Sequence, residues 1–91
     1  MWGPDHASTL SAKHNLASIL HQTGELERAS SLIQETLAKR RQYWGDDDPQ
    51  TITSMGLMAS ILSSRGDLDA ALPLFREAVE RSRSAYGADH S

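Results

Sequence analysis

The chain has 91 residues, of which 38% are hydrophobic and 23% are charged, and this composition indicates one small folded domain rather than a disordered segment. Its net charge of −3 provides no basic surface for nucleic acid, no apolar run reaches the ~20 residues that cross a bilayer, and the absence of cysteine excludes disulfides and thiolate sites. We therefore expect a cytoplasmic (intracellular) protein that has neither nucleic-acid nor membrane partners.

The first half of the chain is repeated in the second half. Gly3, Gly45 and Gly87 lie 42 residues apart, and sixteen of the 49 residue pairs compared at this offset are identical. The identities favour apolar and small positions. They include Thr9/Thr51, Ala17/Ala59, Ile19/Ile61, Leu20/Leu62, Gly24/Gly66, Leu26/Leu68, Ala29/Ala71, Leu32/Leu74 and Glu35/Glu77. This selective placement indicates a structural repeat.

The first unit opens with a predicted helix that ends before Gly24. Within it, Leu16, Ile19 and Leu20 follow the i, i+3, i+4 spacing of one helix face, which predicts an apolar stripe for packing. Gly24 provides a residue that adopts the left-handed conformation without a Cβ penalty, and such a residue commonly ends a helix.

A second helix follows in the same unit and ends before Gly45. Its stripe comprises Leu26, Ala29, Leu32, Ile33, Thr36 and Leu37. Lys39, Arg40 and Arg41 lie in its last turns, where cations oppose the negative end of the helix dipole.

The second unit predicts the same two helices. Asp48 is a suitable N-cap, and Pro49 follows at the first helical position, where no amide donor is needed. Gly66 ends this helix, and Gly56 in its interior should cost roughly 1 kcal/mol against alanine unless a close approach requires it. The fourth helix carries Leu68, Ala71, Leu72, Phe75, Ala78 and Val79. Pro73 falls early in it, where its missing donor costs little if it lies within about the first turn.

We therefore expect an all-α fold, an α-solenoid of antiparallel helix pairs with four helices of roughly 16 to 18 residues in two units. The single domain would cover residues 1–91. Its expected parts are a remnant of a preceding unit at 1–4, repeats at 5–45 and 46–87, and the start of a further unit at 88–91. On this interpretation the chain is an excerpt of a longer array.

Small and apolar residues occupy matched positions in both units. These are Leu16, Ala17, Leu20, Ala29, Ile33 and Thr36 in the first unit, and Met58, Ala59, Leu62, Ala71, Phe75 and Ala78 in the second. The pattern resembles the tetratricopeptide repeat family. The 42-residue period and the junction sequences at 3–6 and 47–51 are similar to its kinesin light chain type. The resemblance implies a repeat scaffold, in a scaffold or signalling protein, that binds a protein or an extended peptide.

No constellation of residues in the sequence points to an enzyme, a cofactor or a metal site. The acidic run at 46–48 lacks the alternating ligands and the closing glutamate of a calcium loop, so helix capping explains it better. His14 and His21 are seven residues apart, whereas a zinc pair favours a spacing of four. Aromatic rings recur at the unit ends as Trp2, Trp44 and Tyr86. We interpret them as packing between neighbouring helix pairs rather than as ligand anchors.

The resemblance also implies where a ligand binds. In such repeats the first helix of each unit lines the concave surface. The predicted binding face therefore consists of Ser11, His14, Asn15, Ser18, His21, Gln22, Thr53, Gly56, Ser60, Ser63 and Ser64. These residues are polar and nearly uncharged, which favours an extended polar peptide or a neighbouring protein as the partner.

The alternative is an assembly element whose repeats pack on copies of themselves. Solenoid units cover their flanks only against neighbours, and about three are usually needed for stability. Two units leave open ends that can stack end to end or exchange a helix pair between chains. We therefore expect the isolated chain to be a homo-oligomer or only marginally stable.

Overall fold

The structure is a computed structural model that describes residues 7–86. These residues form four α-helices and contain no strand. The helices are α1 (Ala7–Gln22), α2 (Leu26–Trp44), α3 (Pro49–Arg65) and α4 (Leu68–Tyr86). The predicted all-α fold of two helix pairs is confirmed. The unit remnants predicted at 1–4 and 88–91 lie outside the described residues.

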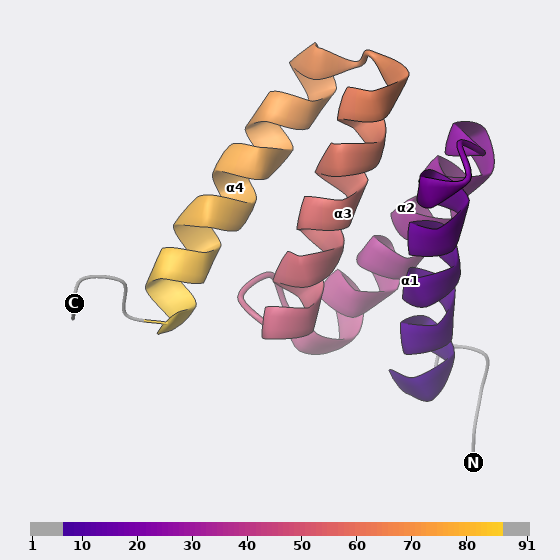
Figure 1. Ribbon diagram of the computed structural model, residues 1–91. Helices are drawn as coiled ribbons and strands as arrows, with labels where there is room; N and C mark the ends of the chain where they lie inside the picture. Colours follow the sequence, from indigo (N-terminus) through magenta and orange to yellow (C-terminus); the bar gives the residue numbers. More distant parts are fainter. Residues whose placement is uncertain (1–6, 87–91) are drawn as a thin grey trace.

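The helices form two antiparallel hairpins that lie side by side (Figure 1). Helix α2 packs against α1 in the first hairpin and against α3 in the second, while α4 packs against α3 at one edge. Helix α1 also touches α3, so the first helices of the two hairpins are neighbours. The resulting body measures 40 × 38 × 19 Å, which is the shape of a short, flat stack. No helix of the described range has the length and apolar character needed to cross a membrane.

The two hairpins turn in the same way. Gly24 and Gly66 have φ values of +86° and +90°, which is the left-handed conformation that glycine adopts most easily. In each turn the amide of the residue that follows the glycine donates at 2.8 Å to a carbonyl in the last helical turn. This bond is typical of a Schellman helix end. The two glycines therefore occupy equivalent environments, as the repeat predicts.

Helix α3 begins as the sequence predicts. The carboxylate of Asp48 accepts hydrogen bonds from the backbone amides of Gln50 at 2.9 Å and Thr51 at 3.2 Å, and Pro49 stands at the first helical position. Of the three consecutive aspartates, Asp48 is thus the one that caps the helix.

The hydrophobic core lies where α1, α2 and α3 meet. It is built on the fully buried residues Ala17, Ala29, Ile33 and Ile61, and the partly buried Leu20, Leu32, Leu57 and Met58 pack against them. Small alanines on α1 and α2 let these helices approach closely, and the isoleucines fill the space between the hairpins.

The predicted stripe of α1 is only partly buried. Leu16 and Ile19 are 48% and 54% exposed, so the prediction that they pack in the core is wrong for the described chain. The residues of α1 that are fully buried are Leu10 and Ala17. The stripe is wider than the contact with α2 and α3, and its outer edge therefore stays uncovered.

Pro73 also differs from expectation, and Trp44 stays partly exposed. Pro73 is the sixth residue of α4, beyond the first turn, so its missing amide leaves one helical carbonyl without its usual donor. Trp44 is 40% exposed and lies edge-on to Tyr43 at a ring distance of 6.2 Å. Trp2 and the side chain of Tyr86 lie outside the described part of the chain.

Candidate functional site

The residues of the predicted binding face all lie on two neighbouring helices, six on α1 and five on α3. Two hydrogen bonds join these helices along the face. His14 Nδ1 lies 3.0 Å from Ser54 Oγ, and His21 Nε2 lies 2.8 Å from Ser64 Oγ. Because these bonds hold α1 beside α3, polar side chains of both repeats border one continuous surface.

The members of the face differ in exposure. The exposed ones are Asn15, Gln22, Thr53, Ser63 and Ser64, and the half-buried ones are Ser11, His14, Ser18, His21, Gly56 and Ser60. The Thr53 hydroxyl donates to the carbonyl of Pro49 at 2.9 Å, so its proton is already engaged. None of these members is a lysine, an arginine or a carboxylate, so the face is polar and without formal charge when its histidines are neutral.

A buried cation lies beneath this face. Arg40 extends from α2 and is only 3% exposed. Its Nη1 donates at 2.9 Å both to the carbonyl of Gln50 and to Ser54 Oγ, and its Nη2 lies 3.4 Å from Ser11 Oγ. Arg40 therefore joins three helices, whereas the sequence suggested only a cation that opposes the helix dipole.

Sequence reasoning missed Arg40 and Ser54 as parts of this region. A signal for Arg40 was present, because it lies seven residues after Ile33 and three after Leu37 and thus continues the buried stripe of α2. No such signal marked Ser54, which is fully buried and matches an alanine in the first unit.

The environment of His14 determines its charge. Burial lowers the pKa of the His14 imidazole, and the nearby positive charge of Arg40 lowers the pKa further. His14 is therefore neutral at neutral pH, and a neutral imidazole carries one donor and one acceptor nitrogen. The face consequently presents hydrogen-bonding groups rather than ionic ones.

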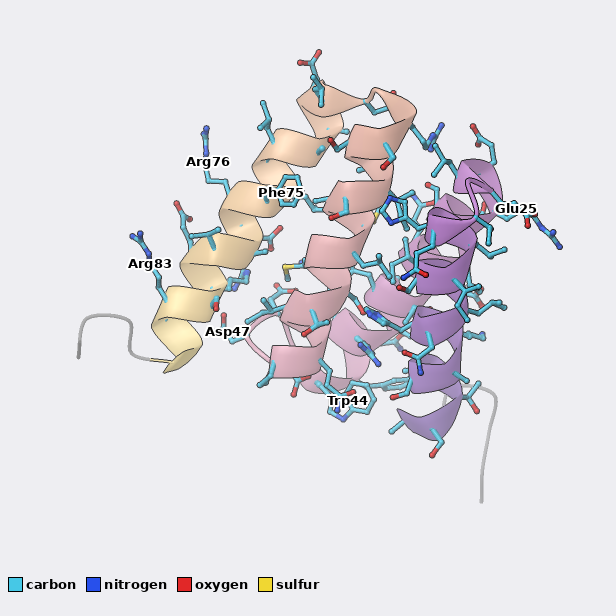
Figure 2. All side chains as sticks on the ribbon, in the orientation of Figure 1. Glu25, Trp44, Asp47, Phe75, Arg76 and Arg83 are labelled. Carbon is cyan, nitrogen blue, oxygen red and sulfur yellow. The ribbon has the colours of Figure 1, made fainter. Side chains whose placement is uncertain are left out.

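The other two aspartates of the acidic run form ion pairs. Arg41 binds Asp46 at 2.7 Å and Glu77 at 3.2 Å, while Arg81 binds Asp47 at 3.0 Å and Glu77 at 2.9 Å. The hydrogen bonds from Arg41 are the main cause of a lowered pKa for Glu77. Figure 2 shows Asp47 on the loop that faces α4. The acidic run thus links the loop between α2 and α3 to α4. Across residues 7–86, no group of three or more potential ligand side chains could hold a metal ion.

A family model described as tetratricopeptide repeat matches residues 8–84, which is most of the chain. A search of curated proteins finds no match.

Proposed function

This chain belongs to the tetratricopeptide repeat family, and we propose that it is a binding module that holds an extended polar peptide, or a protein segment of that kind, on the face formed by α1 and α3. Members of this family generally mediate interactions between proteins. The 42-residue period and the junction sequences favour the kinesin light chain type of repeat, within a scaffold or signalling protein.

The observation that carries the proposal is the pair of hydrogen bonds between α1 and α3. The contacts of His14 with Ser54 and of His21 with Ser64 set the first helix of one repeat beside that of the next. An extended peptide needs such a continuous surface, because each of its residues advances by ~3.3 Å and soon passes from one helix to the next. The hydroxyl, amide and imidazole groups of the face suit hydrogen bonding to a peptide backbone and to polar side chains.

A pair of matched positions provides the test. Ser18 and Ser60 are 42 residues apart, so they occupy the same place on α1 and on α3, and both are half-buried. Replacing both by arginine adds bulk and charge to the face without removing the bonds between the helices. Ala38→Arg is the matched control, because Ala38 is an exposed α2 residue outside the face.

The probe is a library of random linear peptides displayed on phage. Peptides selected on the wild-type chain should lose binding to the Ser18→Arg/Ser60→Arg variant and keep it with Ala38→Arg. Equal binding to both variants would place the binding surface elsewhere. A selection that enriches no peptide at all would count against a peptide-binding function.

One observation favours a second candidate function, that of an assembly element. Large apolar side chains are exposed at both ends of the described stack, on α1 at one end and on α4 at the other. Such exposed apolar groups commonly mark sites of protein association.

A further inference from the structure

The outer side of α4 forms what we call the C-terminal end face, which consists of Leu72, Phe75, Arg76, Val79 and Arg83. Its apolar members Leu72, Phe75 and Val79 are 57%, 37% and 52% exposed. Together with the two arginines and Glu80 they line a shallow hollow along the helix. Figure 2 shows Arg76 and Arg83 projecting from α4 away from the other helices. This face is therefore an apolar strip beside which two arginines outnumber one glutamate.

The opposite end of the stack carries the N-terminal end face, which consists of Leu16, Ile19, Leu20, Glu27 and Glu35. Leu16, Leu20, both glutamates and Arg28 line a hollow between α1 and α2, and Ile19 lies one helical turn from Leu16. The glutamate side chains are 83% and 52% exposed. This face is an apolar strip beside which two glutamates outnumber one arginine, so its net charge is opposite in sign to that of the other end.

The internal junction between the hairpins indicates what each end face is shaped to meet. Ile33 of α2 and Ile61 of α3 are both fully buried in the cluster that joins the hairpins. The residue equivalent to Ile33 in the second unit is Phe75, and the residue equivalent to Ile61 in the first unit is Ile19. The α2 side of the junction thus recurs on the C-terminal end face, and the α3 side recurs on the N-terminal end face. No described residue of another helix pair packs over either face.

The ionic contact of the junction recurs in the same way. Arg41 donates to Glu77 through two nitrogens, at 3.2 and 3.4 Å, and so connects α2 with α4. The residues 42 positions away are Arg83 on the C-terminal end face and Glu35 on the N-terminal end face. Glu35 binds Lys13 at 3.1 Å through one oxygen and remains about half exposed, so it can accept a second donor.

One polar contact of the junction does not recur, and both of its partners change together. Arg65 donates to Ser30 at 3.1 Å between α3 and α2. The equivalent residues are Thr23, three residues after Leu20 of the N-terminal end face, and Leu72 on the C-terminal end face. Leucine thus replaces the serine, and threonine replaces the arginine. The Thr23 hydroxyl donates to the Leu20 carbonyl at 3.1 Å, so neither replacement leaves a polar group without a partner.

We propose that a second copy of this chain stacks head to tail on the first, with the C-terminal end face of one copy against the N-terminal end face of the next, in the register of the internal junction. This inference rests on the assembly function and is independent of the peptide-binding face. A head-to-tail contact that does not close into a ring adds copies without limit, so the average mass should rise steadily with concentration.

Two variants that each block one face test the proposal. Ile19→Asp places a charge on the N-terminal end face, and Val79→Asp places one on the C-terminal end face. Both side chains are about half exposed, so both variants should keep the helical circular dichroism of the wild type. In sedimentation velocity, the wild-type chain should associate and each variant alone should be a monomer. An equimolar mixture should form a heterodimer, because each variant retains the face that the other lacks.

Several outcomes would overturn the proposal. They are a wild-type chain that stays monomeric at every concentration, a single variant that associates like the wild type, and a mixture that stays monomeric. Thr53→Asp, at an exposed α3 residue that belongs to neither end face, should associate like the wild type. So should Ser18→Arg/Ser60→Arg, which separates this result from any failure of peptide binding.

The register is tested by exchanging the charges of the proposed ion pair. Arg83→Glu should raise the association midpoint concentration about fivefold, and adding Glu35→Arg should restore it. A double variant that associates more weakly than Arg83→Glu alone would exclude contact between these residues.

Discussion

Replacing Gly56 by alanine should stabilise the protein by about 1 kcal/mol. Gly56 is the eighth of 17 residues in α3 and has no positive φ, so alanine fits its backbone without strain. A Cβ atom built at this position meets no other heavy atom within 4 Å beyond its own helix. The substitution therefore adds neither a clash nor new packing. Only the intrinsic preference of a helix interior for alanine over glycine remains, and it is about 0.8–1.0 kcal/mol.

Gly66→Ala is the matched control with the opposite sign. A Cβ atom at Gly66 also meets no neighbour within 4 Å, so the two substitutions differ in backbone conformation and not in available space. The φ of Gly66 is +90°, in the left-handed region that costs an alanine roughly 1–2 kcal/mol. The two variants should therefore differ in stability by about 2 kcal/mol or more.

Urea unfolding followed by far-ultraviolet circular dichroism, at one fixed protein concentration, measures this difference. The slope of unfolding free energy against urea should be the same in all three proteins, and the midpoint alone should shift. In thermal unfolding, 1 kcal/mol corresponds to about 4–8 °C for a chain of this size. A destabilised Gly56→Ala variant would refute the reasoning, because it would mean that another group approaches α3 at this residue.

Two further predictions concern charge. The lowered pKa of His14 means that the unfolded chain binds a proton more readily than the folded one, so stability should be lost as pH falls below the usual histidine value of about 6.5. His14→Gln should flatten that slope in urea titrations at several pH values, and an unchanged slope would contradict the assignment. A double-mutant cycle on Arg41→Met and Glu77→Gln should give a coupling free energy of about 0.5–1 kcal/mol that decreases with salt, since both side chains are about one-third exposed. Zero coupling at low salt would show that the pair adds nothing to stability.

The helix ends were predictable because their determinants are local. Gly24 and Gly66 end helices through their own backbone freedom, and Asp48 with Pro49 starts one through bonds within a single turn. The 42-residue repeat then doubled the two glycine signals, whereas the Asp48–Pro49 helix start has no such counterpart at His6 and Ala7. The two hairpins therefore followed from the sequence.

The burial of individual side chains was less predictable than the helix ends. Periodicity identifies the apolar side of a helix, but it does not indicate how wide the neighbouring surface is, so Leu16 and Ile19 were expected in the core. A cation near the end of a helix has the same local pattern whether it faces solvent or, like Arg40, crosses to other helices. The two bonds between α1 and α3 depend on tertiary placement, which His14 and His21 alone did not indicate.

The contacts of Arg40 set an order of disassembly. This side chain belongs to α2 and makes two bonds to groups on α3, the Gln50 carbonyl and the Ser54 hydroxyl, so parting the hairpins breaks both of them. At the equivalent position of the second unit stands Ser82, which is too short to reach as far. A contact between copies would therefore lack this link, and a stack should fall apart into intact chains before any chain opens between its own repeats.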